Sequence, residues 1–580
     1  MEKLSVMIEN VYPELDGGRY PVKRETGDWF EVTADIFQEG HESPEAVLKH
    51  RKKGESKWSE SPMKFIDNDM WRGGFNLPET GIYEYTISAW PEKNKEIVSN
   101  YDRILEVKVD PVIARYAAWY GMWPRSQGTI PNQSATFKDM ENRLKEIHWM
   151  GFDVVYLTPI HPIGKTHRKG ANNALVAKPG EPGCPYAIGN ELGGHCAIEP
   201  GLGTVEDFKH FVSEAKKYNM EVALDIAHTC SPDHPYAKEH PDWFYREPDG
   251  KIKCAENPPK RYEDIYPFNF YSEDWKNLWE ELKQIFIFWI KLGVKIFRID
   301  NPHTKPFAFW NWIISEVQKE YPDAVFLSEA FTRPKVMKAL CKSGFTQTYT
   351  YFTWRNFKQE ITDYFSEITT PPVSEYLRGN LFTNTPDILS EILQYGGRPA
   401  FKLRAALAAT LSSLWGLYNG FELCENKAVP GKEEYADSEK YQYKVWDWDR
   451  PGNIKEFIRK LNMIRKENPA LHYYKNLKFY RADNDNIIFY GKTSPDMSNT
   501  VLTAVNLDPY HTHEAGLFIP IYELGIKPDQ TFILYNLITG ERTMTRGEYF
   551  RIKLEPNNEP ALIFKLERWA SRENNFDYYL

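Results

Sequence analysis

The stretch VKIFRID, residues 294–300, decides the fold class of this 580-residue chain. It is a short, almost continuous apolar run that ends in an acidic residue, Asp300. Such runs are typical of parallel strands whose sheet is buried on both faces. Working outward from it, the same pattern recurs at 153–157, 221–226 and 324–329, and helical stretches such as 136–149 and 204–218 precede the strands. About eight such units can be counted, which predicts a (β/α)8 TIM barrel.

An open doubly wound sheet is the alternative architecture, but no glycine-rich phosphate loop opens any of the predicted helices. Strands are also predicted on either side of the barrel, at 29–37, 71–75, 82–90, 487–491, 500–506, 532–535 and 561–564. We therefore expect a multidomain chain with an N-terminal immunoglobulin-like β-sandwich over 1–112, a catalytic barrel over 113–472 and a C-terminal β-domain over 473–580. A long stretch without helix, about 228–274, is expected to form a functional insertion in the barrel.

Bulk composition excludes several classes of function. The net charge of −9 is spread along the chain, without a basic stretch that could follow a phosphate backbone, so nucleic acid is not expected as a partner. No membrane span and no secretory leader are predicted, and the six cysteines form no CxxC pair. These features predict a cytoplasmic protein with free thiols. The aromatic share of 15% suits sugar binding, although a core rich in aromatic residues explains it equally well.

Acidic residues close three of the predicted strands: Asp225, Asp300 and Glu329. Barrel active sites lie at this end of the strands. Glycoside cleavage with retention requires two carboxyl groups roughly 5–5.5 Å apart, one a nucleophile and the other an acid and base. Arg298 points to the same face as Asp300 and is expected to keep its pKa low, and His303 is expected to hydrogen-bond sugar hydroxyls. Taken singly, such residues are more often helix caps or structural ion pairs.

Three segments carry a family resemblance: FRIDNPH (297–303), FLSEA (326–330) and FTNTPD (382–387). They resemble the ordered signature strands of the α-amylase superfamily, glycoside hydrolase family 13. The resemblance implies that Asp300 is the nucleophile, Glu329 the acid/base and Asp387 the residue that stabilises the transition state. The superfamily usually has Asn-His-Asp in the last motif, whereas this chain has Thr385 and Pro386 before Asp387.

The departures from the superfamily pattern resemble one branch, the α-1,4-glucan:maltose-1-phosphate maltosyltransferases. The matching segments are DGGRYPVKR (16–24), HPIGK (161–165), CSPDHP (230–235), ENPPK (256–260) and YTYFTWRN (349–356). The resemblance implies transfer of maltosyl units from α-maltose 1-phosphate to the non-reducing end of α-1,4-glucans, with release of phosphate, in glycogen-type glucan synthesis. It implies no cofactor, and a homodimer is one oligomeric state to test.

The resemblance also implies which residues hold the donor. The phosphate would be bound by Asn257, Lys260, Tyr262 and Asn301, and the maltosyl unit by Lys169, Asn173, Asp264, Lys440 and Tyr441. Thr229 stands where the branch usually has Gln, and its shorter side chain would contact the sugar through water. No room remains after Trp90 for the helical insert often found in this N-terminal region. Trp119, Tyr120, Trp123 and Trp354 are candidates for stacking the acceptor glucan, or for the core.

Two other hypotheses remain open at this stage. The same scaffold also serves hydrolases and sucrose- or trehalose-type transglycosylases, and a glucan-binding protein without activity is a further alternative. The intact set of Asp300, Glu329 and Asp387 argues against the inactive protein. No metal site is expected, since HExxH spacing does not occur.

Overall fold

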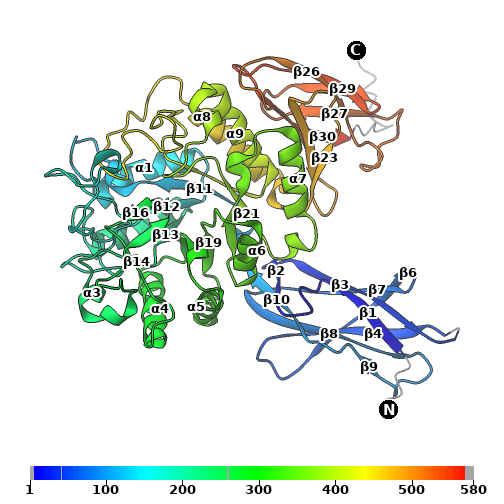
Figure 1. The fold of residues 1–580 in the computed structure, drawn as a ribbon. Coiled ribbons are helices and arrows are strands. Elements are labelled where there is room, and N and C mark those ends of the chain that lie inside the picture. Colours follow the sequence, from blue (N-terminus) through cyan, green and yellow to red (C-terminus); the bar gives the residue numbers. More distant parts are fainter. Residues whose placement is uncertain (1–5, 41, 258–259, 569–580) are drawn as a thin grey trace.

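A computed structural model describes residues 6–40, 42–257 and 260–568 of the chain. Figure 1 shows three parts in chain order: a blue N-terminal pair of sheets, a central barrel with its helices, and an orange C-terminal group of sheets. The barrel lies between two β-rich parts, as the strands predicted on either side of it indicate. Among the described residues, no helix is both long and apolar enough to cross a membrane.

Eight parallel strands close into the central barrel, which rules out the open doubly wound sheet. The predicted strands 153–157, 221–226, 294–300 and 324–329 are all present, each shorter by at most a few residues at its ends. In barrel order the strands are β11 (Ala117–Met122), β12 (Val154–Leu157), β13 (Glu221–Ile226), β18 (Ile296–Ile299), β19 (Val325–Ser328), β20 (Gln347–Tyr349), β21 (Gly379–Phe382) and β22 (Leu414–Tyr418).

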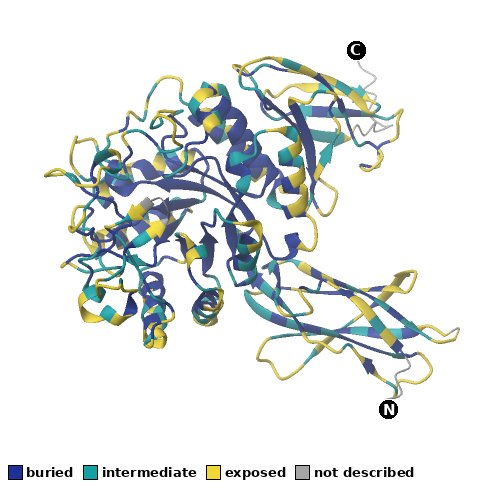
Figure 2. Cartoon of the chain, viewed as in Figure 1, coloured by how far each residue is buried: buried dark blue, intermediate teal, exposed yellow. Residues whose placement is uncertain are grey.

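Helices follow the barrel strands and pack around them, with their exposed faces outward (Figure 2). Thr136 and Thr204 start the two predicted helices with complete capping boxes, each paired with an Asp three residues later. The main helices are α1 (Phe137–Trp149), α2 (Val205–Lys217), α4 (Trp275–Lys291), α5 (Phe307–Glu320), α6 (Pro334–Lys342), α7 (Lys358–Thr369), α8 (Glu391–Tyr395), α9 (Gly397–Leu411) and α10 (Lys455–Glu467).

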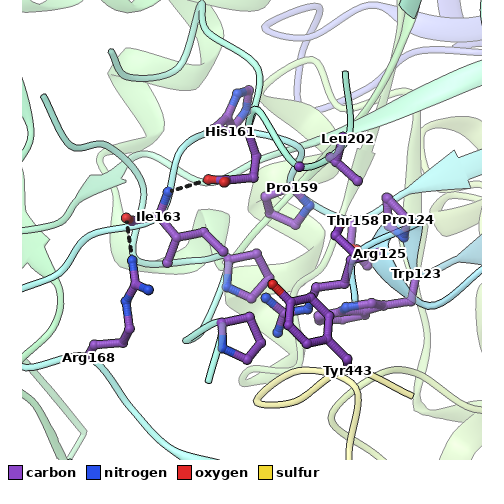
Figure 3. Close-up of a pocket in the computed structure, with 15 residues that line it drawn as sticks. Trp123, Pro124, Arg125, Thr158, Pro159, His161, Ile163, Arg168, Leu202 and Tyr443 are labelled. Carbon is purple, nitrogen blue, oxygen red and sulfur yellow. Dashed lines mark hydrogen bonds between the residues drawn. The ribbon is translucent and has the colours of Figure 1, made fainter. Parts of the chain in front are cut away.

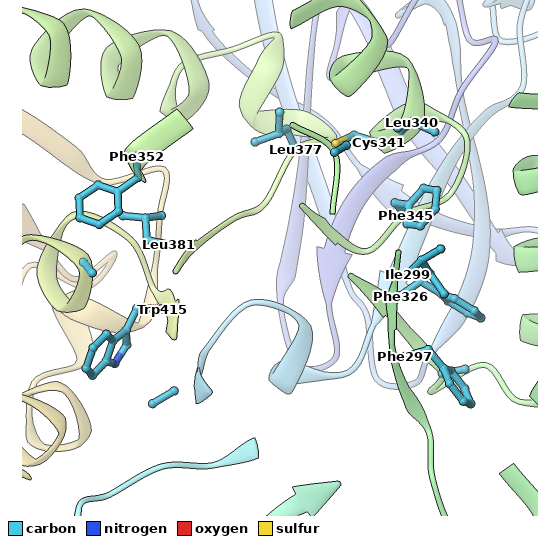
Figure 4. Close-up of a cluster of buried hydrophobic side chains, with 14 of the residues drawn as sticks. Phe297, Ile299, Phe326, Leu340, Cys341, Phe345, Phe352, Leu377, Leu381 and Trp415 are labelled. Atoms are coloured by element: carbon cyan, nitrogen blue, oxygen red, sulfur yellow. The ribbon is translucent and has the colours of Figure 1, made fainter. Parts of the chain in front are cut away.

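Because side chains alternate along a strand, each barrel strand contributes to two apolar layers, one inside the barrel and one between the strands and the helices. In β18, Phe297 and Ile299 point outward and join the core between strands and helices (Figure 4). The ring of Phe297 packs 5.0 Å from that of Phe286 on α4 and 5.8 Å from that of Phe326 on β19. Burying one such side chain contributes about 1.5–3 kcal/mol. Ile296 points to the barrel interior instead, so Arg298, two residues on, faces the interior as well.

The N-terminal part is a sandwich of two sheets, ordered β1-β3-β7-β6 and β2-β10-β8-β4-β5, with β9 paired to β8. Alternating buried residues of β3, from Phe30 to Ile36, form its core. The strands are β1 (Val6–Tyr12), β2 (Val22–Glu25), β3 (Trp29–Gln38), β4 (Pro44–Lys52), β5 (Ser59–Pro62), β6 (Lys64–Asp67), β7 (Met70–Asn76), β8 (Gly81–Pro91), β9 (Ser99–Asn100) and β10 (Leu105–Asp110).

The C-terminal part has one sheet of order β23-β24-β25-β30-β27-β28 and a two-stranded sheet, β26-β29. One face of this part forms an apolar cluster of its own, which includes Phe489, Phe532 and Phe564, whereas Ile488 and Val505 join the main core. The strands are β23 (Leu477–Tyr480), β24 (Ile487–Thr493), β25 (Thr500–Asn506), β26 (His513–Phe518), β27 (Thr531–Asn536), β28 (Arg542–Arg546), β29 (Tyr549–Leu554) and β30 (Ala561–Arg568).

One buried carboxylate, Glu375, joins all three parts. It lies in the barrel segment before β21 and is 3% exposed. It accepts hydrogen bonds from Tyr12 Oη (2.7 Å) and Arg24 Nη1 (2.7 Å) of the N-terminal sandwich and from Lys475 Nζ (2.9 Å), next to β23. Burial opposes its ionisation, but Arg24 and Lys475 outweigh burial and lower the pKa of Glu375 to about 2. The carboxylate is therefore charged and paired at neutral pH.

The insertion after β13 differs from the prediction that 228–274 contains no helix. It holds a five-residue helix, α3 (Pro235–Glu239), which starts at the cap His234 with Pro235 at its first position. It also contains a 3-10 turn, Pro241–Trp243. Two small antiparallel pairs lie in it as well, β14 (Thr229–Cys230) with β17 (Tyr266–Pro267) and β15 (Ala255–Asn257) with β16 (Lys260–Tyr262). The helix was missed because a single turn is too short to show an apolar period.

Candidate active site

Arg298 joins three carboxylates inside the mouth of the barrel. Its Nη1 lies 3.0 Å from Asp225 Oδ1 and 2.9 Å from Asp300 Oδ1, and its Nη2 lies 2.9 Å from Glu329 Oε1. Register explains the meeting: Arg298 pairs with Asp225 on β13 and with Leu327 on β19. The guanidinium side chain is 1% exposed, so these charges interact away from bulk water.

Asp225 is the most deeply buried member of the group. Two phenols donate to its Oδ2, Tyr156 Oη at 2.6 Å and Tyr186 Oη at 2.8 Å. Burial raises the pKa of Asp225 to about 6 and the neighbouring Asp300 adds to the rise, although Arg298 and the two phenols act in the opposite direction. Asp225 is therefore ionised at neutral pH and locks the orientation of Arg298.

Asp300 and Glu329 have pKa values that move in opposite directions. Burial disfavours the charge on Asp300, but Arg298 and then Lys305 outweigh burial and lower its pKa. Burial raises the pKa of Glu329 to about 8, and the charges of Asp300 and Asp387 add to that rise against the pull of Arg298. The 2.9 Å contact with Arg298 is thus outweighed by desolvation and like charge. The site pairs an ionised carboxylate with a protonated carboxylic acid at neutral pH.

The residue after the candidate nucleophile connects the two carboxyl groups. Asn301 adopts a left-handed conformation, with φ 44° and ψ 52°. Its backbone N–H donates to Glu329 Oε2 (3.2 Å) and its Nδ2 donates to Asp300 Oδ2 (3.2 Å). Lys305 Nζ donates hydrogen bonds to the backbone of this turn, to the carbonyl of Asn301 (3.0 Å) and to that of Asp300 (3.3 Å). A non-glycine residue with positive φ persists only where its surroundings fix it.

Asp387 lies at the open side of the group, with its side chain 40% exposed. Lys440 Nζ donates a hydrogen bond to its Oδ1, and the same ammonium lies 5.0 Å from the ring centroid of Tyr186. Lys169 and Asp264 are both buried, and the Oδ1 of Asp264 has no hydrogen-bond partner among the described residues. Burial raises the pKa of Asp264, while Lys169 and Lys440 lower it, so these charges lie near one another.

Five other predicted donor-site residues are less deeply buried than Asp225 and Glu329. Asn173, Thr229, Tyr262, His303 and Tyr441 are all partly buried. His303 is neutral at pH 7, because burial and Lys305 lower its pKa. Asn257 and Lys260 are paired in the β15–β16 hairpin, but their side chains lie outside the described part of the chain.

The aromatic candidates for acceptor stacking separate into two groups. Trp119 and Tyr120 are fully buried, one in the barrel interior and one hydrogen-bonded to Glu422, and are therefore core residues. Trp123 is also buried but lines a cavity, and Trp354 remains partly exposed with its Nε1 bonded to Glu433.

Sequence reasoning missed Tyr156, Tyr186 and Lys305. Tyr156 lies in a strand that was predicted, and its interior-facing position could have pointed to it. Tyr186 sits in an irregular loop, and Lys305 lies beyond the motif that was recognised, so no periodic signal was present for either.

One group of described residues has the composition of a metal site: His195, Cys230 and His234. Its ring nitrogens are already paired. His234 Nδ1 accepts from the backbone N–H of Tyr236 (3.0 Å), so His234 Nε2 donates to His195 Nδ1 (3.2 Å), and His195 Nε2 donates to the carbonyl of Ala227 (2.9 Å). This chain of neutral histidines leaves no ring lone pair for an ion, and we assign it a structural role.

The closed barrel, with an Arg-linked Asp and Glu at its strand ends and two β-rich flanks, defines an enzyme of the α-amylase superfamily. A family model for the α-amylase catalytic domain matches residues 125–325. A maltogenic α-amylase from Thermotoga neapolitana superposes with a TM-score of 0.61 at 21% identity, covering 78% of this chain and 99% of its own. A cyclomaltodextrinase structure superposes with a TM-score of 0.61 at 16% identity, over 96% of this chain and 99% of its own. Both likenesses concern the fold.

Relatives from two bacteria identify the family more closely. The chain is 47% identical to the α-1,4-glucan:maltose-1-phosphate maltosyltransferase of Myxococcus xanthus, over 99% of each chain. It is 43% identical to the enzyme of the same name from Rhodospirillum rubrum, over 97% of this chain and 95% of that one. Models described as α-1,4-glucan:maltose-1-phosphate maltosyltransferase, domain N/S, and as GLGE, C-terminal, match residues 5–113 and 479–566. The chain belongs to the α-1,4-glucan:maltose-1-phosphate maltosyltransferase family.

The alignment with the Myxococcus xanthus relative spans 659 positions, more than the 580 residues of this chain. The relative therefore has residues without a counterpart in this chain.

Proposed function

We propose that this enzyme transfers maltosyl units from α-maltose 1-phosphate to the non-reducing ends of α-1,4-glucans, with retention of configuration and release of phosphate. One observation supports the mechanism. The guanidinium of Arg298 contacts both Asp300 and Glu329, yet the pKa of Asp300 is lowered and the pKa of Glu329 is raised. Family membership supports the identity of the donor and of the acceptor.

In the first step, a carboxylate oxygen of Asp300 attacks C1 of the donor, and the C1–O bond to phosphate breaks. Glu329, protonated because burial holds its pKa near 8, gives its proton to the departing phosphate oxygen. Register aligns the two strands, with Ile299 beside Ser328 immediately before the two carboxyl residues. Neighbouring strands lie about 4.8 Å apart, which suits the carboxyl separation of a retaining enzyme.

In the second step, the ionised Glu329 removes the proton from the 4-OH of the acceptor, whose oxygen displaces Asp300 from C1. Asp387 stabilises the positive charge that develops on the sugar ring in both steps. Asp387 is paired with Lys440, so donor binding exchanges part of that ion pair for sugar hydroxyls. Asn257, Lys260, Tyr262 and Asn301 bind the phosphate, and Lys169, Asn173, Thr229, Asp264, His303, Lys440 and Tyr441 bind the maltosyl unit.

The deciding experiment measures phosphate release from α-maltose 1-phosphate with and without maltohexaose, together with chromatography of the glucans. Acceptor-dependent release, with products longer by two glucose units, is expected, and Asp300→Ala is expected to abolish both. Activity on starch, sucrose or trehalose without phosphate release would instead support a hydrolase or another transglycosylase on the same barrel.

We also propose that the enzyme works in the cytoplasm as a homodimer. The six cysteines, all within described segments, are free thiols, which suits a reducing compartment. The homodimer rests on the family resemblance alone, and light scattering coupled to size-exclusion chromatography tests it through the measured mass.

A further inference from the structure

Glu439 is a buried carboxylate that the proposed mechanism does not use. It directly precedes Lys440 and is 1% exposed. Three uncharged side chains donate hydrogen bonds to it: Tyr418 Oη and Asn419 Nδ2 (2.7 Å) to its Oε1, and Trp446 Nε1 (3.0 Å) to its Oε2. Burying a carboxylate costs free energy that a neutral side chain of the same size would not cost. Glu439 therefore has a role that packing alone does not explain.

The three donors require a side chain that only accepts hydrogen bonds. A carboxylate satisfies the phenol, the amide and the indole together, because both of its oxygens are acceptors. Glutamine at this position would turn its own N–H groups toward at least one of the donors, and that hydrogen bond would be lost. The phenol of Tyr418 stays protonated, since burial and the charge of Glu439 raise its pKa. The arrangement is thus specific to a carboxylate.

Tyr418 connects this carboxylate to the loop of Asp387. It is the last residue of β22, and its backbone N–H donates to Asn384 Oδ1 (2.9 Å), while Asn384 Nδ2 donates to its carbonyl (3.1 Å). Asn384 is fully buried and lies three residues before Asp387. One residue of β22 therefore holds the Asp387 loop through its backbone and Glu439 through its side chain.

Arg125 holds the backbone of the same segment. Its Nη2 donates to the carbonyls of Glu439 (2.9 Å) and Lys440 (2.8 Å). Arg125 is itself buried and lines a small cavity after β11 together with Trp123 and Tyr443 (Figure 3). The main chain at Lys440 is therefore anchored twice, by the guanidinium and by the carboxylate of the preceding residue.

These contacts form a closed ring. It runs along the chain from Asp387 to Asn384, and by hydrogen bonds from Asn384 to Tyr418. Tyr418 bonds in turn to Glu439. Lys440 is the next residue, and its ammonium group pairs with Asp387. We propose that Glu439 is a positioning residue, which sets the place of the Lys440 ammonium relative to Asp387 and thereby the affinity for the donor. The donor named here rests on the proposed function.

Glu439→Gln in the full chain tests this role, because it keeps the size of the side chain and removes an acceptor. It should lower kcat/KM for phosphate release from α-maltose 1-phosphate about 10-fold, as for the loss of one hydrogen bond to a charged group. Beside Lys440→Met the same substitution should lower kcat/KM less than about 2-fold, because the group that Glu439 positions is already absent. Losses that multiply in the double variant would overturn the proposal.

Glu422→Gln is the matched control. Glu422 is also buried and also accepts from a phenol, Tyr120 Oη (2.6 Å), but its hydrogen bonds lead to β11 and to its own turn. Its kcat/KM should stay within about 2-fold of that of the unmodified chain, since it bears on no charged group of the reaction centre. Equal losses of kcat/KM in Glu422→Gln and Glu439→Gln would overturn the positioning role.

Tyr418→Phe repeats the test with a milder change. It removes one donor from Glu439 and keeps the ring and the backbone bonds to Asn384, so the fold should be kept. Its kcat/KM should fall about 3-fold, as for one hydrogen bond among several, and this loss should also disappear beside Lys440→Met. A loss that stays the same beside Lys440→Met would count against the proposal.

A crystal structure of Glu439→Gln gives a measurement that does not depend on turnover. The Lys440 ammonium, hydrogen-bonded to Asp387 in the unmodified chain, is expected to move beyond about 4 Å, the limit of an ion pair. An ion pair that keeps its geometry would refute the positioning role. Lack of phosphate release by the unmodified chain would refute only the proposed function, because the ion pair is observed without a substrate.

Discussion

Replacing Tyr186 with Phe removes one hydroxyl from Asp225 and keeps the ring against Lys440. The lost bond, 2.8 Å from Tyr186 Oη to Asp225 Oδ2, has an ionised acceptor above pH 6 and a neutral one below it. Hydrogen bonds to charged groups contribute about 1.5–3 kcal/mol and neutral ones about 0.5–1.5 kcal/mol. The variant should therefore lose roughly 1–1.5 kcal/mol more stability at pH 8 than at pH 5, because only the ionised state of Asp225 loses the stronger bond.

The sign follows from linkage. The pKa of Asp225 is raised on folding, from 3.8 to about 6, so this group favours folding fully below pH 3.8 and loses that contribution as pH rises through 6. The Tyr186 phenol lowers the pKa of Asp225 and so limits this loss of stability at high pH. Without the phenol, the pKa of Asp225 should rise by about one unit.

Thermal melting at pH 5 and pH 8 measures the effect. For a barrel of this size the extra destabilisation corresponds to a fall in Tm about 2 °C larger at pH 8 than at pH 5. Tyr474→Phe is the matched control, because its hydroxyl donates to a neutral acceptor, the carbonyl of Ser374, at 3.0 Å. An equal fall in Tm at both pH values for Tyr186→Phe would refute the assignment of a charged acceptor.

Three further substitutions test other contacts. Glu329→Gln should lower kcat by a factor of roughly 10²–10⁴ and abolish the alkaline limb near pH 8 in the pH–rate profile, since that limb reports loss of the Glu329 proton. An alkaline limb that persists at the same pH would contradict the assignment. Lys305→Met should move the acid limb of kcat/KM to higher pH, because a cation that lowers the pKa of Asp300 is lost, while Lys305→Arg should restore the limb. An unmoved limb in Lys305→Met would count against this role. Arg378→Met should cost about 3–5 kcal/mol in a melting experiment, because it removes the cation paired with the buried carboxylate of Asp110 and leaves Glu25 with Arg115 alone. An unchanged Tm would show that the Arg378 pairing is dispensable.

The barrel was predictable because buried parallel strands have a simple sequence pattern: short apolar runs, such as 294–300, that end in a charged residue. The carboxylates were predictable for the same reason, since Asp225, Asp300 and Glu329 close such strands. Tyr186 and Lys305 were not, because they come from irregular segments whose approach to the strands depends on long-range packing. The small helix Pro235–Glu239 was hidden by its length, and the core role of Trp119 could not be separated from a binding role by residue type.

Glu375 has a consequence for how this enzyme can be divided. Its carboxylate, in the barrel, accepts hydrogen bonds from β1 and β2 of the N-terminal sandwich and from the segment that leads into the C-terminal sheets. A fragment cut to the barrel would keep Glu375 but lose Tyr12, Arg24 and Lys475, and its carboxylate would be left charged without a counterion. Exchange of a flanking domain between relatives must therefore keep these three side chains opposite Glu375, or replace the carboxylate together with them.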